Sequence, residues 1–74
     1  DRYSEIRSRF SKISPREYDV LNLLVQGESS KAMARTLNIS IKTIELHRAN
    51  LLHKTESKSS TELVQLAVLS NILE

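Results

Sequence analysis

The chain of 74 residues is long enough for one small domain, and the absence of cysteine excludes a disulfide framework and a thiolate zinc site. No apolar run exceeds four residues, so the sequence predicts no membrane span or membrane partner, and we expect a cytoplasmic protein. The net charge of +2 is unevenly divided, because residues 29–55 carry five basic side chains against one acidic side chain. The chain begins at Asp1, and we expect it to be part of a longer protein.

The leader, residues 1–12, carries an apolar stripe at helical spacing. Tyr3, Ile6, Phe10 and Ile13 follow one another at intervals of three, four and three residues. A helix this short needs packing to be stable. The leader is therefore either a linker helix from an upstream domain or a strap that lies on the body, which begins at residue 13.

The first body helix has a complete start signal. Ser14 can act as the N-cap, Pro15 suits the first helical position, and Glu17 completes a capping box. The inward stripe comprises Val20, Leu21 and Leu24. Gly27, the only glycine, is expected to end the helix.

Residues 29–54 predict two helices joined by a three-residue turn, the pattern of a helix-turn-helix. Ser29 or Ser30 can cap the first helix, and Asn38 tolerates the left-handed conformation at its end. Ser40 can cap the second helix, over residues 41–54, which is the candidate recognition helix.

A last helix is predicted over residues 60–70, opened by a capping box of Ser59 and Glu62. It is apolar on nearly every side, either because the core encloses it or because it has a second buried surface, against a dimer partner or an upstream domain. We favour the dimer contact. Its expected residues are Leu63, Leu66, Val68 and Leu69, and Ile72 and Leu73 could extend the patch. The whole pattern predicts an all-α fold, a four-helix bundle that follows a possible linker helix.

The recognition helix can be divided into two sides at 100° per residue. The side expected to face the core comprises Ile44, Arg48, Leu51 and Thr55, flanked by Ile41 and His47. The outward side comprises Lys42, Glu45, Leu46, Ala49, Asn50 and His53. Arg48 is expected to be structural, with Glu17 as its partner. His47 and His53 diverge by about 120°, so they cannot share a metal, and no cofactor is predicted.

The outward side chains suit contacts with double-stranded DNA. Lys42 and Thr43 fit backbone phosphates, with guanine as a second possibility for Lys42, and Leu46 either contacts thymine methyl groups or is an ordinary surface leucine. Glu45 either accepts a hydrogen bond from cytosine N4 or is simply solvated. Ala49 allows close approach. Flanking phosphate contacts are expected from His53 and Lys54, and the predicted DNA-binding site is completed by Asn50, Ser30 and Lys31.

These segments together resemble the LuxR-type DNA-binding domain of the NarL/FixJ class of bacterial two-component response regulators. The resemblance is carried by ISPREYDVLNLLVQGESSKAMARTLNIS, IKTIELHRAN and SSTELVQLA, in order from residue 13 to about residue 67. It implies a third helix that enters the major groove, with Lys42, Thr43, Glu45, Leu46 and Ala49 where family members touch DNA. It also implies a fourth helix that forms the dimer contact and an N-terminal receiver domain that controls the protein through phosphorylation.

Three positions depart from the family pattern. Ala32 stands where glutamate is usual, which removes the capping box of the second body helix. The polar residues 55–57 replace a Leu-Gly-Val-like stretch, and Glu45 stands where lysine or another polar residue often occurs.

The sequence therefore predicts the effector domain of a transcriptional regulator, a homodimer on operator DNA that could also contact RNA polymerase. One alternative is a promoter-reading domain of a sigma-like factor. Another is a protein-interaction bundle that binds no nucleic acid. An enzyme is not expected, because no nucleophile–base arrangement, metal spacing or phosphate loop is present in the sequence.

Overall fold

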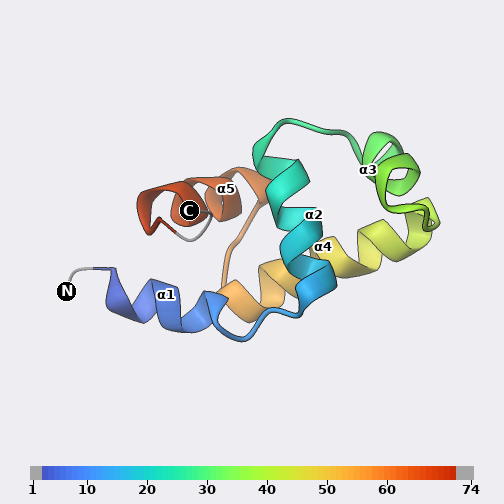
Figure 1. The fold of residues 1–74 in the computed structure, drawn as a ribbon. Coiled ribbons are helices and arrows are strands. Elements are labelled where there is room, and N and C mark those ends of the chain that lie inside the picture. The colour runs from blue at the N-terminus through green and yellow to red at the C-terminus, as the bar shows by residue number, and fades with distance from the viewer. Residues whose placement is uncertain (1–2, 72–74) are drawn as a thin grey trace.

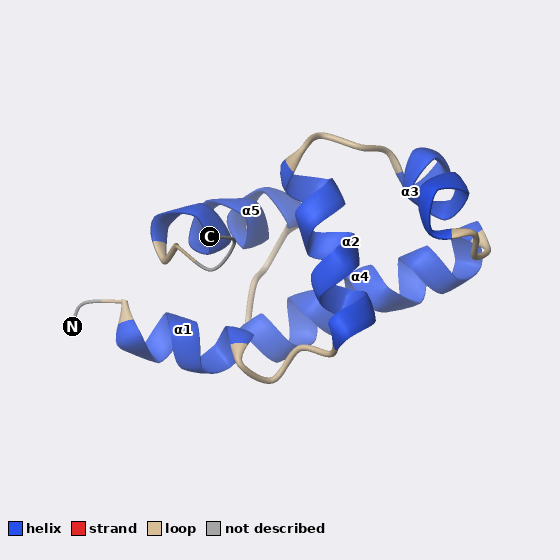
Figure 2. Ribbon diagram, in the orientation of Figure 1, coloured by secondary structure: helices blue, strands red, loops and turns tan. Residues whose placement is uncertain are grey.

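A computed structural model describes residues 3–71 and contains five helices and no strand within that range (Figures 1 and 2). The helices are α1 (Ser4–Phe10), α2 (Pro15–Val25), α3 (Ser30–Leu37), α4 (Ile41–Thr55) and α5 (Ser60–Leu69). The predicted all-α class is confirmed. No helix among the described residues is both long and apolar enough to cross a membrane.

Helix α4 is the centre of the molecule, because it contacts each of the other four helices. In Figure 1, α2 crosses α4, while α3 lies at one end of the molecule beside the start of α4. The fully buried side chains include Leu21, Met33, Ile44, Leu51 and Leu63, so α2 to α5 all contribute to one core. This packing fixes one side of α4 and leaves the other to solvent.

Serine side chains start four of the five helices, since each accepts a hydrogen bond from the N–H three residues later. The caps are Ser14, Ser29, Ser40 and Ser59. Ser29 rather than Ser30 therefore caps α3. Ser14 also has the predicted reciprocal box, because the Glu17 carboxylate accepts from the Ser14 N–H at 2.9 Å.

The predicted box of Ser59 and Glu62 is only half correct. The Ser59 hydroxyl accepts from the Glu62 N–H at 3.1 Å, but the Glu62 carboxylate accepts from the Lys58 N–H at 3.2 Å. Ser59 has an extended backbone with φ −154°, and its own N–H is not the partner of Glu62. The Glu62 carboxylate therefore accepts from the N–H of the residue before the N-cap, rather than from the N–H of the N-cap itself.

Four of the five described helices end in left-handed residues, and the one after α5 is Asn71 with φ 58°. Gly27 after α2 has φ 86°, Asn38 after α3 has φ 57°, and Glu56 after α4 has φ 56°. The first two were predicted from their residue types. Glu56 has a Cβ and no amide side chain, so its left-handed conformation is the costly one. The recognition helix extends to Thr55, one residue beyond its predicted end.

The leader forms a helix that packs on the body. Phe10 is 3% exposed and belongs to the core, and Ile6 and Ile13 pack against that core. Arg9 in α1 also lies 3.4 Å from the Glu56 carboxylate at the end of α4. The leader therefore lies on the body as a strap, and its role as a linker from an upstream domain stays a prediction.

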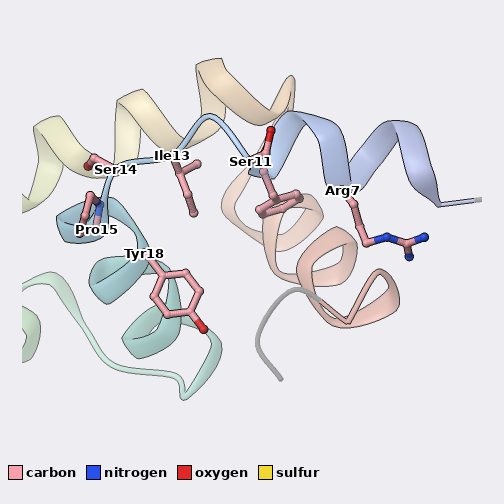
Figure 3. Close-up of a pocket in the computed structure, with 7 residues that line it drawn as sticks. Arg7, Ser11, Ile13, Ser14, Pro15 and Tyr18 are labelled. Atoms are coloured by element: carbon pink, nitrogen blue, oxygen red, sulfur yellow. The ribbon is translucent and has the colours of Figure 1, made fainter.

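A mainly apolar recess lies at the junction of α1 and α2 (Figure 3). It is lined by Arg7, Phe10, Ser11, Ile13, Ser14, Pro15 and Tyr18. None of these seven residues is a histidine, cysteine or carboxylate, so the recess itself contains no acid–base pair.

The predicted dimer residues on α5 divide into two groups. Leu63 is fully buried in the core, so its assignment to a dimer surface is wrong. Leu66 is half-buried and packs against the core, whereas Val68 and Leu69 are 54% and 57% exposed. Ile72 and Leu73 lie outside the described residues.

Candidate nucleic-acid interface

The exposed side of α4 is polar and basic, with one large apolar residue. Lys42, Glu45, Ala49 and His53 are exposed, and Leu46 is 59% exposed, while Asn50 is half-buried. Ile44, Leu51 and Thr55 are fully buried on the other side. The predicted orientation of the helix is therefore confirmed. Ile41, expected beside the core, is 48% exposed instead, because it precedes the first turn that packs.

The N-terminus of α4 is ordered by a pair of hydroxyl groups. The Ser40 hydroxyl accepts from the Thr43 N–H at 3.0 Å, and the Ser40 and Thr43 hydroxyls lie 2.9 Å apart. The remaining N–H groups of the first turn and the helix dipole favour an anion at this end. Lys42, in the same turn, adds a full positive charge.

A basic recess adjoins this N-terminus. It is lined by Lys31, Ala34, Arg35, Asn38, Ile39, Ser40 and Ile41. Lys31 and Arg35 are both exposed and stand four residues apart on α3, so they lie on one face of that helix. The sequence predicted a DNA contact for Lys31 but not for Arg35, although the spacing of four within a basic segment could have identified Arg35.

Arg48 is structural, as predicted, but its partner is not Glu17. Its guanidinium donates to the Ser30 hydroxyl at 2.7 Å and to the Ser60 hydroxyl at 2.9 Å. It also lies 3.9 Å from the Glu45 carboxylate. The helical wheel placed Arg48 on the inward side correctly but could not show that the N-termini of α3 and α5 face it.

Glu45 is exposed but not simply solvated. Its Oε1 accepts a hydrogen bond from the Ser30 hydroxyl. Since a serine hydroxyl has one proton, Ser30 cannot donate to a phosphate while it makes this bond. The structure therefore gives Ser30 an internal partner where the sequence predicted a DNA contact.

The partner of Glu17 is Lys54, whose ammonium lies 2.7 Å from Oε1. The side chain of Glu17 is 5% exposed and that of Lys54 is 33% exposed. Burial raises the pKa of Glu17, but the hydrogen bonds from Lys54 and the Ser14 N–H, with the charge of Lys54, outweigh it and lower that pKa below its ordinary value. Lys54 is thus tied to the core, unlike the exposed His53.

The two histidines do not belong to a metal site among the described residues. His47 is half-buried, and its Nδ1 is buried without a hydrogen-bond partner among the described residues. Within residues 3–71, no three side chains of the types that ligate metals lie close enough to hold an ion.

Comparison with known proteins places this chain in a family. Residues 11–67 match the luxR family of bacterial regulatory proteins. The transcriptional regulatory protein FixJ of Bradyrhizobium diazoefficiens is 42% identical over 69 residues, which cover 93% of this chain and 34% of FixJ. The oxygen regulatory protein NreC of Staphylococcus epidermidis is 35% identical over 74 residues, covering 100% of this chain and 34% of NreC.

The fold is similar to that of a solved relative. The crystal structure of full-length FixJ from B. japonicum gives a TM-score of 0.84 at 40% identity, covering 97% of this chain and 36% of that one. The chain thus spans about a third of the length of its relatives. FixJ is a transcriptional regulatory protein and NreC an oxygen regulatory protein, and the matched family is one of regulatory proteins rather than enzymes. The chain therefore belongs to the luxR family of bacterial regulatory proteins, as a DNA-binding helix-turn-helix domain of the response-regulator class that includes FixJ and NreC.

Proposed function

We propose that this domain binds duplex DNA sequence-specifically by placing the exposed side of α4 in the major groove. The proposal rests mainly on one observation, the division of α4 into a buried apolar side and an exposed polar side. Four helices hold its apolar side, while Lys42, Leu46 and Ala49 remain exposed on the other side of the same helix. A helix about 10–12 Å across, presented in this way, fits the major groove.

Each side chain of the interface is expected to contact the DNA group that its position on the domain allows. Lys42 contacts a backbone phosphate beside the N-terminus of α4, with Thr43, and Leu46 contacts thymine methyl groups. Lys31 and Arg35 contact phosphates from α3, and His53 contacts a flanking phosphate. Ala49 and Asn50 face the bases. Lys54 keeps a smaller role, because its ammonium already pairs with Glu17.

The salt dependence of binding tests the role of Lys42. Each phosphate contact contributes about 0.9 to the slope of log K against log salt concentration. We expect Lys42→Ala to weaken binding to all duplexes and to lower the slope by about one. Fluorescence anisotropy with a labelled duplex, at several salt concentrations, measures both quantities.

Lys58→Ala is the matched control, because Lys58 is an exposed lysine in the loop between α4 and α5. It removes the same charge and should leave the slope unchanged. Equal slopes for the wild type and Lys42→Ala would remove Lys42 from the interface. A slope lowered equally by both variants would mean that only the net charge matters.

We further propose that the domain forms a homodimer on DNA through α5. Val68 and Leu69 line an apolar depression with Val64 and Gln65, and the half-buried Leu66 lies in the same helix. Exposed apolar patches of this kind are typical of interfaces. Helix-turn-helix dimers read half-sites about one helical turn of DNA apart, and we expect that spacing for a two-fold contact here.

Changing Val68 and Leu69 together to serine tests this interface. Both residues are exposed, so the fold should persist, while cooperative binding to a duplex with two half-sites should be lost. Binding to a single half-site should stay within about twofold. Unchanged cooperativity would contradict a dimer contact at these residues.

A part of the protein outside this chain would control its binding to DNA. The chain covers about a third of FixJ and NreC, and we propose an N-terminal receiver domain whose phosphorylation releases or pairs these domains. Contact with RNA polymerase at a promoter is a further proposal of the same kind.

A further inference from the structure

A chain of hydrogen bonds connects three helices at the exposed side of α4. Arg48 donates to the hydroxyls of Ser60, the first residue of α5, and Ser30, the first residue of α3. Ser30 in turn donates to Oε1 of Glu45. The chain therefore runs from the half-buried guanidinium outward to an exposed carboxylate.

The direction of these bonds fixes the Glu45 carboxylate. Arg48 can only donate, so the Ser30 oxygen accepts from it and the single Ser30 proton points to Glu45. Bonds arranged head to tail in this way strengthen one another. The positive charge of Arg48, 3.9 Å from Oε1, favours the same position. The carboxylate thus loses much of the rotamer freedom of an exposed glutamate before any ligand binds.

The second oxygen of Glu45 is free to accept. Its side chain is 57% exposed, and Oε2 has no partner within residues 3–71. Glu45 also stands three residues after Lys42 and four before Ala49, so all three share one face of α4. A carboxylate on that face repels phosphates, and an exocyclic amine at a base edge is the group it can accept from.

Cytosine fits this oxygen better than adenine does. In the major groove cytosine N4 is a donor without an adjacent acceptor on the same base, whereas adenine N6 lies beside the acceptor N7. A carboxylate cannot donate to N7, so it leaves that atom unpaired. Guanine and thymine present acceptors, which a carboxylate repels.

We propose that Glu45 is a specificity-determining residue that accepts from cytosine N4, and that Ser30 and Arg48 are positioning residues that hold it for this contact. The proposal rests on the proposed function, because it places α4 in the major groove. It assigns Ser30 a part in base selection, although its hydroxyl is not available to donate to the DNA.

Selection of bound sites from a random duplex library tests the proposal. We expect the wild type to select cytosine at one position of each half-site, by about tenfold over other bases. Glu45→Ala should abolish the preference at that position and leave the other positions unchanged. Ser30→Ala should reduce the same preference by about threefold to tenfold, the value of one hydrogen bond.

Ser8→Ala is the matched control, since Ser8 is an exposed helical serine in α1. Thermal melting followed by circular dichroism checks that each variant folds. If Ser30→Ala were structural only, affinity would fall equally for all duplexes and the base preference would stay.

The outcomes separate this proposal from the one that it rests on. If the wild type retains no duplex, the proposed function fails. If it selects a site and Glu45→Ala selects the same site, Glu45 does not read a base and the inference is overturned. If Glu45→Ala loses the cytosine preference but Ser30→Ala keeps it in full, the positioning role of Ser30 is overturned.

Discussion

Glu17 joins the start of α2 to the end of α4. One oxygen, Oε1, accepts from the Ser14 N–H at 2.9 Å and from the Lys54 ammonium at 2.7 Å. The first bond is local and was predicted from the capping box. The second joins residues 37 apart in the sequence, and no pattern along the chain identifies such a partner. For that reason Arg48 was paired with Glu17 incorrectly, although its inward position was predicted correctly.

The lowered pKa of Glu17 makes the stability of the domain dependent on pH. The folded-state pKa lies below the ordinary value of 4.5, so the stabilisation is fully present above about pH 4.5 and is lost as the pH falls through the folded-state pKa. We expect Glu17→Gln to unfold more easily at pH 7 and to lose less stability on acidification than the wild type. Urea unfolding between pH 3 and pH 7 measures this difference, and parallel curves would contradict it.

Lys54→Met removes the other half of the pair while keeping its aliphatic length. It leaves a buried carboxylate with one donor fewer, which should lower the free energy of unfolding at pH 7 by about 1–3 kcal/mol. A change below about 0.3 kcal/mol in the free energy of unfolding would show that the Ser14 N–H alone is sufficient to stabilise the buried Glu17 carboxylate.

At the scale of elements, the sequence predicted the helix starts better than the helix ends. A serine cap and its target N–H are three residues apart, so Ser14, Ser29 or Ser30, Ser40 and Ser59 could be recognised locally. Gly27 and Asn38 were recognised as ends because their residue types tolerate a positive φ. The end of α4 at Glu56 was not, since glutamate carries no such signal.

The left-handed Glu56 offers a test of backbone strain. Glu56→Gly relieves the strain of a Cβ at φ 56° and should stabilise the domain by about 1 kcal/mol. It also removes the exposed ion pair with Arg9, which is worth little. Urea unfolding measures the net effect.

Glu56→Ala separates the two contributions. It loses the ion pair but keeps the strain, so it should be slightly less stable than the wild type. If the alanine variant were as stable as the glycine variant, the left-handed conformation at this position would not be the source of the strain.

At the scale of the whole molecule, the leader belongs to the folded unit. The family match begins at residue 11, yet Phe10 of α1 is 3% exposed within the core. The spacing of Tyr3, Ile6, Phe10 and Ile13 predicted a helix but could not say where it would pack, because a stripe is equally suited to an upstream domain. The outward side of α4 could be predicted from the sequence. The apolar side of this helix must face the core that the described helices share, so its polar side must face solvent.

Phe10→Ala should therefore destabilise the entire domain. Truncating a buried phenylalanine costs about 3–5 kcal/mol, a large part of the stability of a domain this small. Urea unfolding followed by circular dichroism measures it, with Phe10→Leu as a milder variant should the alanine variant fail to fold. A loss below about 0.5 kcal/mol would show that α1 is dispensable to the core.

The location of bound DNA on the domain shows whether α4 enters the major groove. The measurement is a nuclear magnetic resonance titration of the ¹⁵N-labelled chain with a selected duplex, followed by intermolecular contacts between side-chain protons and base protons. We expect the largest shifts in α4 and the first turn of α3, with contacts from Leu46 and Ala49 to the major-groove edges of bases. Shifts confined to α1 or α5, with none along α4, would contradict it.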